Sequence, residues 1–301
     1  MNYWIVISLG LLLAACGTPQ RSALNETYRD DLELWKAQRR ESVGGTNGWT
    51  TVAGLHWLAL GGNSIGTNIN NAIVLSAGIA PGRLGTLWRS GNEVRFEAFP
   101  GVAAKVNTLP VGSAVLRSDA GGAKPDMLTV GSLRMFVIQR GDRLGLRVRD
   151  QSSPARLGFR GLEYFPVAAQ WRFVGRFEPY SPPRRVRITD VTGAVNDEPC
   201  PGAVVFTVRG REHYLSVMED EPGGDYLIVF RDATAGASTY AAGRFLKVPR
   251  PGRDEPVIID FNRAYNPPCV FTDFATCPLP PPENALPFPI EAGERKYGGG
   301  H

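Results

Sequence analysis

The order of apolar and polar residues predicts one amphipathic helix near the start of the chain. Leu24, Tyr28, Leu32 and Trp35 recur at the spacing of one helix face, and charged residues fill the opposite face up to residue 40. Ser22 is a possible N-cap, and two consecutive glycines after residue 43 end the helix. We expect this helix to pack against the domain that follows it in the chain.

After residue 48 the pattern changes to short runs in which apolar and polar residues alternate. Three hairpins are recognisable, with turns at residues 90–92, 141–142 and 209–210. Each turn contains glycine, which adopts positive φ angles without the steric cost that other residues incur. Few helical stretches interrupt this series, so the sequence predicts a mainly β protein built from sandwiches or barrels.

A turn-rich segment at residues 150–161 divides the strands into two groups. We therefore predict a first domain over residues 24–150, made of the helix and a β-sandwich. A second β-rich domain, a barrel or a sandwich, is expected over residues 162–297. The many prolines at residues 278–289 exclude a central strand there, so we expect this tail to wrap the surface in extended form.

The first fifteen residues have the pattern of an export signal. An apolar run at residues 5–13 is too short for a comfortable membrane span, and small residues follow it before Cys16. The sequence Leu-Ala-Ala-Cys closely resembles the lipobox of bacterial lipoproteins. This resemblance implies cleavage before Cys16 and a lipid on its thiol, with residues 16–23 as a tether. The first four residues contain no Lys or Arg, which leaves an uncleaved apolar N-terminus as the alternative.

The lipobox resemblance also implies a location. Gly17, rather than Asp, follows the cysteine, and in Gram-negative lipoproteins this implies sorting to the outer membrane, facing the periplasm. The membrane, through the lipid on Cys16, is then the expected partner of the protein.

Composition excludes several other classes. The chain has 301 residues, of which 43% are hydrophobic and 21% charged, so it is globular rather than disordered. Its arginine-rich runs alternate with apolar residues and form no basic cluster, so we expect no nucleic-acid partner. His56 and His213 are the only histidines before the terminal one, which excludes a metal site of several histidines. We expect neither a metal nor a cofactor.

A Gly-x-Ser-x-Gly sequence at residues 62–66 matches the nucleophile elbow of serine hydrolases. That mechanism requires a strand, a tight turn and then a helix, but an asparagine-rich stretch and a strand-like run follow here. We therefore interpret this sequence as an ordinary β-turn.

Three cysteines remain after Cys16 is set aside. An oxidising compartment allows disulfides, and Cys269 and Cys277 bracket a short loop whose closure would contribute roughly 2–3 kcal/mol. We predict a Cys269–Cys277 disulfide, with Cys200 free between two prolines. The alternative is three buried thiols.

A dense set of polar residues in the C-terminal turns is the candidate binding site. Its members are Asp232, Thr234, Tyr240, Arg244, Asp260, Asn262, Tyr265, Asn266 and Glu294. Asp260 ends a run that has the pattern of a buried strand, and each unpaired buried polar group costs ~1–3 kcal/mol. We therefore expect these residues to converge on one concave patch under residues 269–294. The alternative is a structural network in which Arg244 pairs with Asp232 or Asp260.

The C-terminal half resembles an uncharacterised bacterial family, domain of unknown function 1684. The segments that carry this resemblance lie at residues 230–234, 239–245, 260–269 and 275–281, together with residues 48–58 near the start. The resemblance covers nearly all of the mature chain. The family has no established activity to transfer, so the resemblance implies where function lies and not which chemistry it uses.

The first domain is similar to a forkhead-associated β-sandwich. Residues 58–68, 71–75 and 133–148 follow the strand order of that family. Its members place an Arg after an Ile-Gly pair and read phosphothreonine with a Ser-x-x-His sequence. Here Thr67 takes the place of the Arg, and no Ser-x-x-His follows. The resemblance therefore implies a fold without phosphothreonine recognition.

Three functions remain open. The lack of a catalytic motif favours a binding module for a small molecule or envelope component, which needs a mostly apolar pocket with a few polar groups. The alternative is a hydrolase-like envelope enzyme that uses the carboxylates of Asp232, Asp260 and Glu294, and it needs two of them in one cleft. A purely structural lipoprotein needs neither feature.

Overall fold

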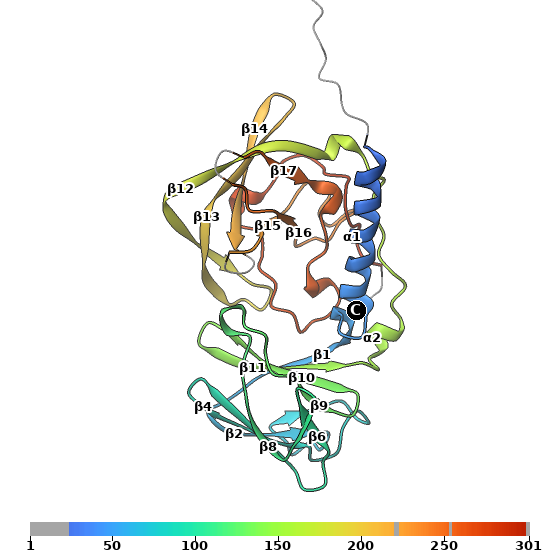
Figure 1. Ribbon diagram of the computed structural model, residues 1–301, viewed down its shortest axis with the longest axis vertical. Coiled ribbons are helices and arrows are strands. Elements are labelled where there is room, and N and C mark those ends of the chain that lie inside the picture. Colours follow the sequence, from blue (N-terminus) through green and yellow to red (C-terminus); the bar gives the residue numbers. More distant parts are fainter. Residues whose placement is uncertain (1–23, 220–222, 253–254, 299–301) are drawn as a thin grey trace, which may run out of the picture.

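The computed structural model describes residues 24–219, 223–252 and 255–298, and it shows two β-rich domains with one long helix beside them (Figure 1). Cys16 and the predicted export signal lie outside the described residues. In the described part of the chain, no helix is long and apolar enough to cross a membrane.

Helix α1 (Glu26–Gly44) packs on the second domain, not on the first as its place in the chain suggests (Figure 1). Asn25 caps its N-terminus, accepting a hydrogen bond from the backbone N–H of Tyr28 at 2.8 Å. The N–H of Gly45 bonds to the carbonyl of Glu41 and ends the helix. A short 3₁₀ turn, Trp49–Thr51, then leads the chain into the first domain.

The first domain is a sandwich of two sheets. One sheet has the strand order β1-β11-β10-β9-β6-β7 and the other β3-β2-β4-β5-β8, with only β2 and β3 parallel. Leu87, Phe96 and Leu133 are fully buried between them. The strands are β1 (Val52–Trp57), β2 (Gly61–Gly66), β3 (Ile73–Val74), β4 (Gly85–Ser90), β5 (Glu93–Ala98), β6 (Ala104–Val106), β7 (Leu109–Val111), β8 (Ser113–Leu116), β9 (Leu128–Val130), β10 (Leu133–Arg140) and β11 (Arg143–Asp150).

The second domain is a nearly closed six-stranded barrel. Its strands are antiparallel in the order β16-β15-β14-β13-β12-β17, and the edge strands β16 and β17 contact each other. A short helix α2 (Pro154–Leu157) precedes it. The strands are β12 (Arg172–Thr189), β13 (Val195–Val208), β14 (Arg211–Glu219), β15 (Tyr226–Phe230), β16 (Arg244–Val248) and β17 (Val257–Asp260). This arrangement confirms the predicted mainly β fold of a helix, a sandwich and a second β-rich domain.

The proline-rich tail is extended, as expected, but part of it lies inside the barrel rather than on the surface. Leu286, Ile290 and Ala292 belong to the barrel core and are buried. Asn284 fixes the tail, because its side-chain amide donates to the carbonyls of Ser216 and Val229. In Figure 1 red segments of the C-terminal part of the chain lie between the barrel strands and α1. The tail therefore closes the barrel core.

The three hairpins predicted from glycine-containing turns are present. They join β4 to β5, β10 to β11 and β13 to β14. Gly91, Gly141 and Gly210 adopt the positive φ angles that these turns need, 58°, 57° and 77°.

Candidate functional site

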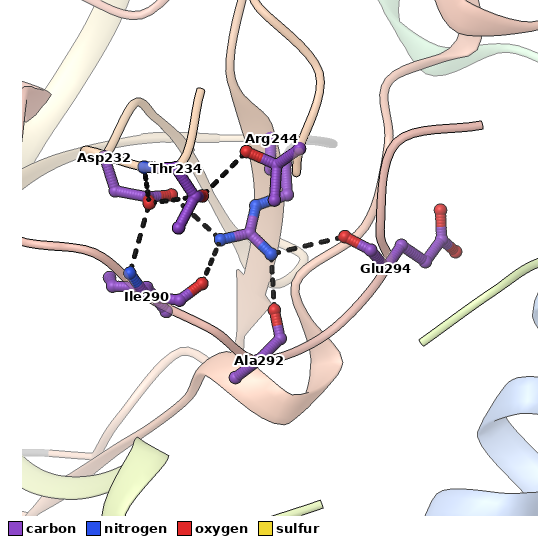
Figure 2. Close-up of polar contacts among 7 residues, drawn as sticks. Asp232, Thr234, Arg244, Ile290, Ala292 and Glu294 are labelled. Atoms are coloured by element: carbon purple, nitrogen blue, oxygen red, sulfur yellow. Dashed lines mark hydrogen bonds and ion pairs between the residues drawn. The ribbon is translucent and has the colours of Figure 1, made fainter. Parts of the chain in front are cut away.

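Arg244, the first residue of β16, lies at the centre of a buried network that ties the tail to the barrel (Figure 2). Its Nη2 donates to the Asp232 carboxylate at 2.8 Å and to the carbonyl of Ile290 at 2.9 Å. Its Nη1 donates to the carbonyls of Ala292 and Glu294. The side chain is only 1% exposed, so it is not available to a ligand.

The Asp232 carboxylate is satisfied in the same network. Its Oδ1 accepts hydrogen bonds from the backbone N–H and the hydroxyl of Thr234, at 2.8 and 2.6 Å, and from the N–H of Ile290 at 3.1 Å. Both charges of the pair are therefore neutralised and hydrogen-bonded inside the protein. This geometry corresponds to the alternative stated from the sequence, a structural network in which Arg244 pairs with Asp232.

A separate cavity of about 740 Å³ lies between α1 and the barrel, and we call it the α1 groove. Helix α1 forms one wall, and residues of β12, β15, β16 and β17 form the other. Its apolar and aromatic lining includes Trp35, Trp49, Leu227, Phe245, Ile258 and Tyr265. The groove therefore combines apolar and aromatic side chains with seven charged ones: Asp31, Arg39, Arg172, Asp225, Lys247, Asp260 and Arg263.

A buried ion pair fixes α1 at one part of the groove. Arg39 donates from Nε to the Glu294 carboxylate at 2.8 Å and from Nη2 to the carbonyl of Asn266 at 2.7 Å. Its guanidinium also lies 4.6 Å from the ring centre of Tyr265. Glu294 is fully buried, and burial raises the pKa of its carboxyl group, an effect that Arg39 opposes.

A second polar contact fixes the N-terminal half of α1. The Tyr28 hydroxyl donates to the Asp260 carboxylate at 2.8 Å. Burial and the adjacent carboxylate both raise the pKa of Tyr28 above its ordinary range, so the phenol stays a donor. Asp260 also accepts from the backbone and side-chain amides of Asn262, at 3.1 and 3.0 Å, and lies 3.5 Å from Nε of Arg263.

A smaller hollow of about 400 Å³ adjoins the groove along α1. Tyr28, Asp31 and Arg172 line both spaces, so the two meet at these three side chains. Asp31 is held by an ion pair with Arg263. Together the two hollows form an elongated depression along the helix.

The structure divides the nine predicted site residues instead of gathering them on one concave patch. Asp260 and Tyr265 line the α1 groove. Tyr240 is half-buried beside Cys269. The other six are buried in hydrogen-bond networks: Asp232, Thr234, Arg244, Asn262, Asn266 and Glu294. A binding role for the groove-lining pair stays a prediction.

The residues that α1 and β12 bring to the groove were not predicted as site residues from the sequence. Tyr28 and Trp35 were recognised, but only as part of an apolar helix face. Arg39 and Arg172 carry no motif, and each becomes notable only because of the residue across from it in the fold.

The predicted Cys269–Cys277 disulfide is not present: both residues, like Cys200, are free thiols. The two side chains are neighbours, and the backbone N–H of Cys269 donates to the Cys277 sulfur at 3.1 Å. The hydrogen bond between the thiols lowers the pKa of Cys269. Cys277 is buried in an apolar cluster with Met218 and Val229, and Cys269 packs against the same cluster while partly buried.

No group of three or more His, Cys, Asp or Glu side chains that could hold a metal occurs in the parts of the chain that the structure describes. The carboxylates of the predicted acid–base set are also separated. Of Asp232, Asp260 and Glu294, only Asp260 lines the groove.

Comparison with known proteins places a family domain at the barrel. Residues 157–295 match the model of a family described as "Protein of unknown function (DUF1684)". The match includes the barrel and most of its tail. It does not include residues 48–58 or α1, so one wall of the groove lies outside the matched region.

Two solved structures show distant similarity. A solution NMR structure of an uncharacterized protein from Haloarcula marismortui is 26% identical, covering 46% of this chain and 78% of that one, with a TM-score of 0.40. The FHA domain of FhaA, in a crystal structure with the intracellular domain of another protein, is 18% identical. That comparison covers 32% of this chain and 97% of the domain, with a TM-score of 0.23. No curated protein matches the chain.

Replacing Arg244 with Ala should destabilise the fold by about 3–5 kcal/mol, because it leaves the buried Asp232 carboxylate without its cation. Urea unfolding measures this loss. Arg231→Ala, which removes an exposed neighbour, is the matched control and should change stability little. A loss in Arg244→Ala no greater than in the control would show that the network is not structural.

Replacing Arg39 with Met should lower the free energy of unfolding by a similar amount near neutral pH, because Glu294 is then buried without a cation. Burial raises the pKa of Glu294, so the folded variant binds a proton more tightly than the unfolded chain does. The stability of the variant relative to the parent should therefore recover as the pH falls towards the ordinary Glu pKa of about 4.3.

Urea unfolding of the parent and Arg39→Met over a pH series tests this recovery. Arg40→Met changes an exposed arginine next to Arg39 and serves as the control. A deficit that stays constant from neutral to acidic pH would contradict the role assigned to the Arg39–Glu294 pair.

Proposed function

We propose that this protein is a binding module, and that the α1 groove holds a small organic ligand. The observation that carries the proposal is the groove itself, a cavity of about 740 Å³ with a mainly apolar and aromatic lining. Ligand sites in proteins are typically cavities of roughly 300–1,000 Å³ with such linings and a few well-placed polar groups. The DUF1684 domain would supply the floor of the site, and α1 would supply its second wall.

The fixed position of α1 supports this proposal. The helix is joined to the barrel by the Arg39–Glu294 ion pair and by the Tyr28–Asp260 hydrogen bond. Both contacts lie within the groove walls, so the cavity keeps its shape without a ligand. A preformed site loses less conformational entropy on binding than a site that must first be ordered.

The alternative of a hydrolase-like enzyme has less support. Acid–base catalysis by two carboxylates needs both of them in reach of one substrate. Asp232 and Glu294 do not line the groove and are paired with Arg244 and Arg39, and Asp260 accepts hydrogen bonds from two neighbouring side chains. The binding module is therefore the function that the geometry favours.

The location that we propose is the cell envelope, with the lipid on Cys16 as the membrane anchor. The Leu-Ala-Ala-Cys sequence supports this proposal, and Gly17 supports the outer membrane facing the periplasm. The membrane is then the partner of the chain through its N-terminus, while the groove remains available for an envelope ligand.

Blocking the groove should abolish ligand binding. Gln38 is exposed and lines the groove from α1, so Gln38→Trp should fill it with an indole ring. The probe is N-phenylnaphthylamine, an uncharged aromatic dye whose fluorescence rises in apolar sites. Titration should show binding to the parent protein and at least about tenfold weaker binding to Gln38→Trp, a loss of about 1.4 kcal/mol.

Ala37→Trp is the matched control, because residue 37 is exposed one position away and does not line the groove. This variant should bind the dye as the parent does. A parent protein that does not bind the dye, or equal binding by both tryptophan variants, would show that the groove is not the ligand site.

Changing the lipobox cysteine tests the proposed anchor. Cys16→Ser removes the thiol that would carry the lipid, so the protein should lose incorporation of a labelled fatty acid and leave the membrane fraction. Cys200→Ser is the control and should keep both properties. Lipid labelling that persists in Cys16→Ser would refute the anchor.

A further inference from the structure

We infer that the ligand of the α1 groove is an amphipathic organic anion, whose acidic group is bound by Arg172 and whose apolar body lies in the groove. This inference rests on the proposed function and specifies its ligand class. The acidic group is a carboxylate, phosphate or sulfonate, because arginine binds all three through the same paired N–H donors.

Arg172 occupies the place where the larger and smaller hollows meet. It is the first residue of β12, its side chain is exposed, and it lines both spaces. A group bound there can be reached from either hollow. A ligand that fills the groove therefore has one part of its surface next to this guanidinium.

The charge of Arg172 is not neutralised by the carboxylate across from it. Asp260 is its cross-strand partner in the β12–β17 pairing. The Asp260 side chain instead accepts hydrogen bonds from Tyr28 and Asn262 and lies beside Arg263. Because these partners already satisfy the Asp260 carboxylate, it does not need a further cation.

The other acidic residue at this junction is also engaged. Asp31 forms an ion pair with Arg263. Within the described residues, Arg172 makes no ion pair and no side-chain hydrogen bond, and its guanidinium lies 5.6 Å from the ring centre of Tyr28. Its five N–H donors are therefore available to a ligand.

The remaining charges of the groove do not offer a comparable group. Arg39 is paired with Glu294, and Arg263 is paired with both Asp31 and Asp260. Lys247 lies on β16 and has an interaction partner of its own, and Asp225, which precedes β15, is an acid. Arg172 is therefore the cation in the groove that favours an anionic group on the ligand. The apolar lining beside it favours an apolar body for the rest of the ligand.

Two dyes with the same ring system test this assignment. N-phenylnaphthylamine is uncharged, and anilinonaphthalene sulfonate adds one sulfonate to the same skeleton. The parent protein should bind the sulfonate dye more tightly than the neutral dye. Arg172→Ala should weaken binding of the sulfonate dye by about tenfold and leave binding of the neutral dye unchanged, as expected for loss of one charge-assisted contact.

Arg29→Ala is the control for general electrostatics. Arg29 is exposed on α1 next to Tyr28 but lines neither hollow, so its loss removes the same charge without changing the site. This variant should bind both dyes as the parent does. Inorganic phosphate should compete with the sulfonate dye at concentrations that leave the neutral dye bound.

Several results would overturn the inference. If Arg172→Ala weakens the binding of both dyes equally, or of neither dye, Arg172 does not select an anion, although the groove remains a binding site. If Arg29→Ala has the same effect as Arg172→Ala, the preference is a property of the whole surface. A parent protein that fails to bind the neutral dye contradicts the proposed function instead, so the two failures are distinguishable.

Discussion

The position of α1 depends on the need of one buried carboxylate for a cation. Glu294 is fully enclosed near the end of the chain, and an unpaired charge there would cost several kcal/mol. Arg39 supplies the cation from a helix that is 255 residues away in the sequence, and its second donor reaches the carbonyl of Asn266. This pair holds α1 against the barrel, and the space left between helix and barrel is the α1 groove.

The need of buried charges for partners also explains why most polar residues of the C-terminal turns do not form a binding surface. Arg244 and Asp232 are buried together, and each also bonds to the backbone of the tail. Such groups organise the turns and the tail, and their hydrogen-bonding capacity is used within the protein. The groove differs because one of its charged residues, Arg172, is exposed and forms no ion pair within the described part of the chain.

Local patterns in the sequence were sufficient for the fold class and for the three hairpins, because alternation and glycine-containing turns act over a few residues. The site was only partly accessible in this way. Asp260 could be recognised at the end of an apolar strand, but its partner Tyr28 could not, because an apolar helix face does not specify which domain it covers. Likewise, the spacing of Cys269 and Cys277 is compatible with a disulfide, whereas the fold holds both as thiols in an apolar cluster.

The tail inside the barrel also determines the order in which the chain can complete its structure. Leu286, Ile290 and Ala292 complete the core of the second domain, and Glu294 follows them. These residues follow every strand of the barrel in the chain, so the barrel core cannot close until they have emerged from a ribosome or an export channel. Helix α1 emerges before all of these strands but finds its ion-pair partner, Glu294, only after them. This contact therefore forms late, as expected for a topology dominated by contacts between distant residues.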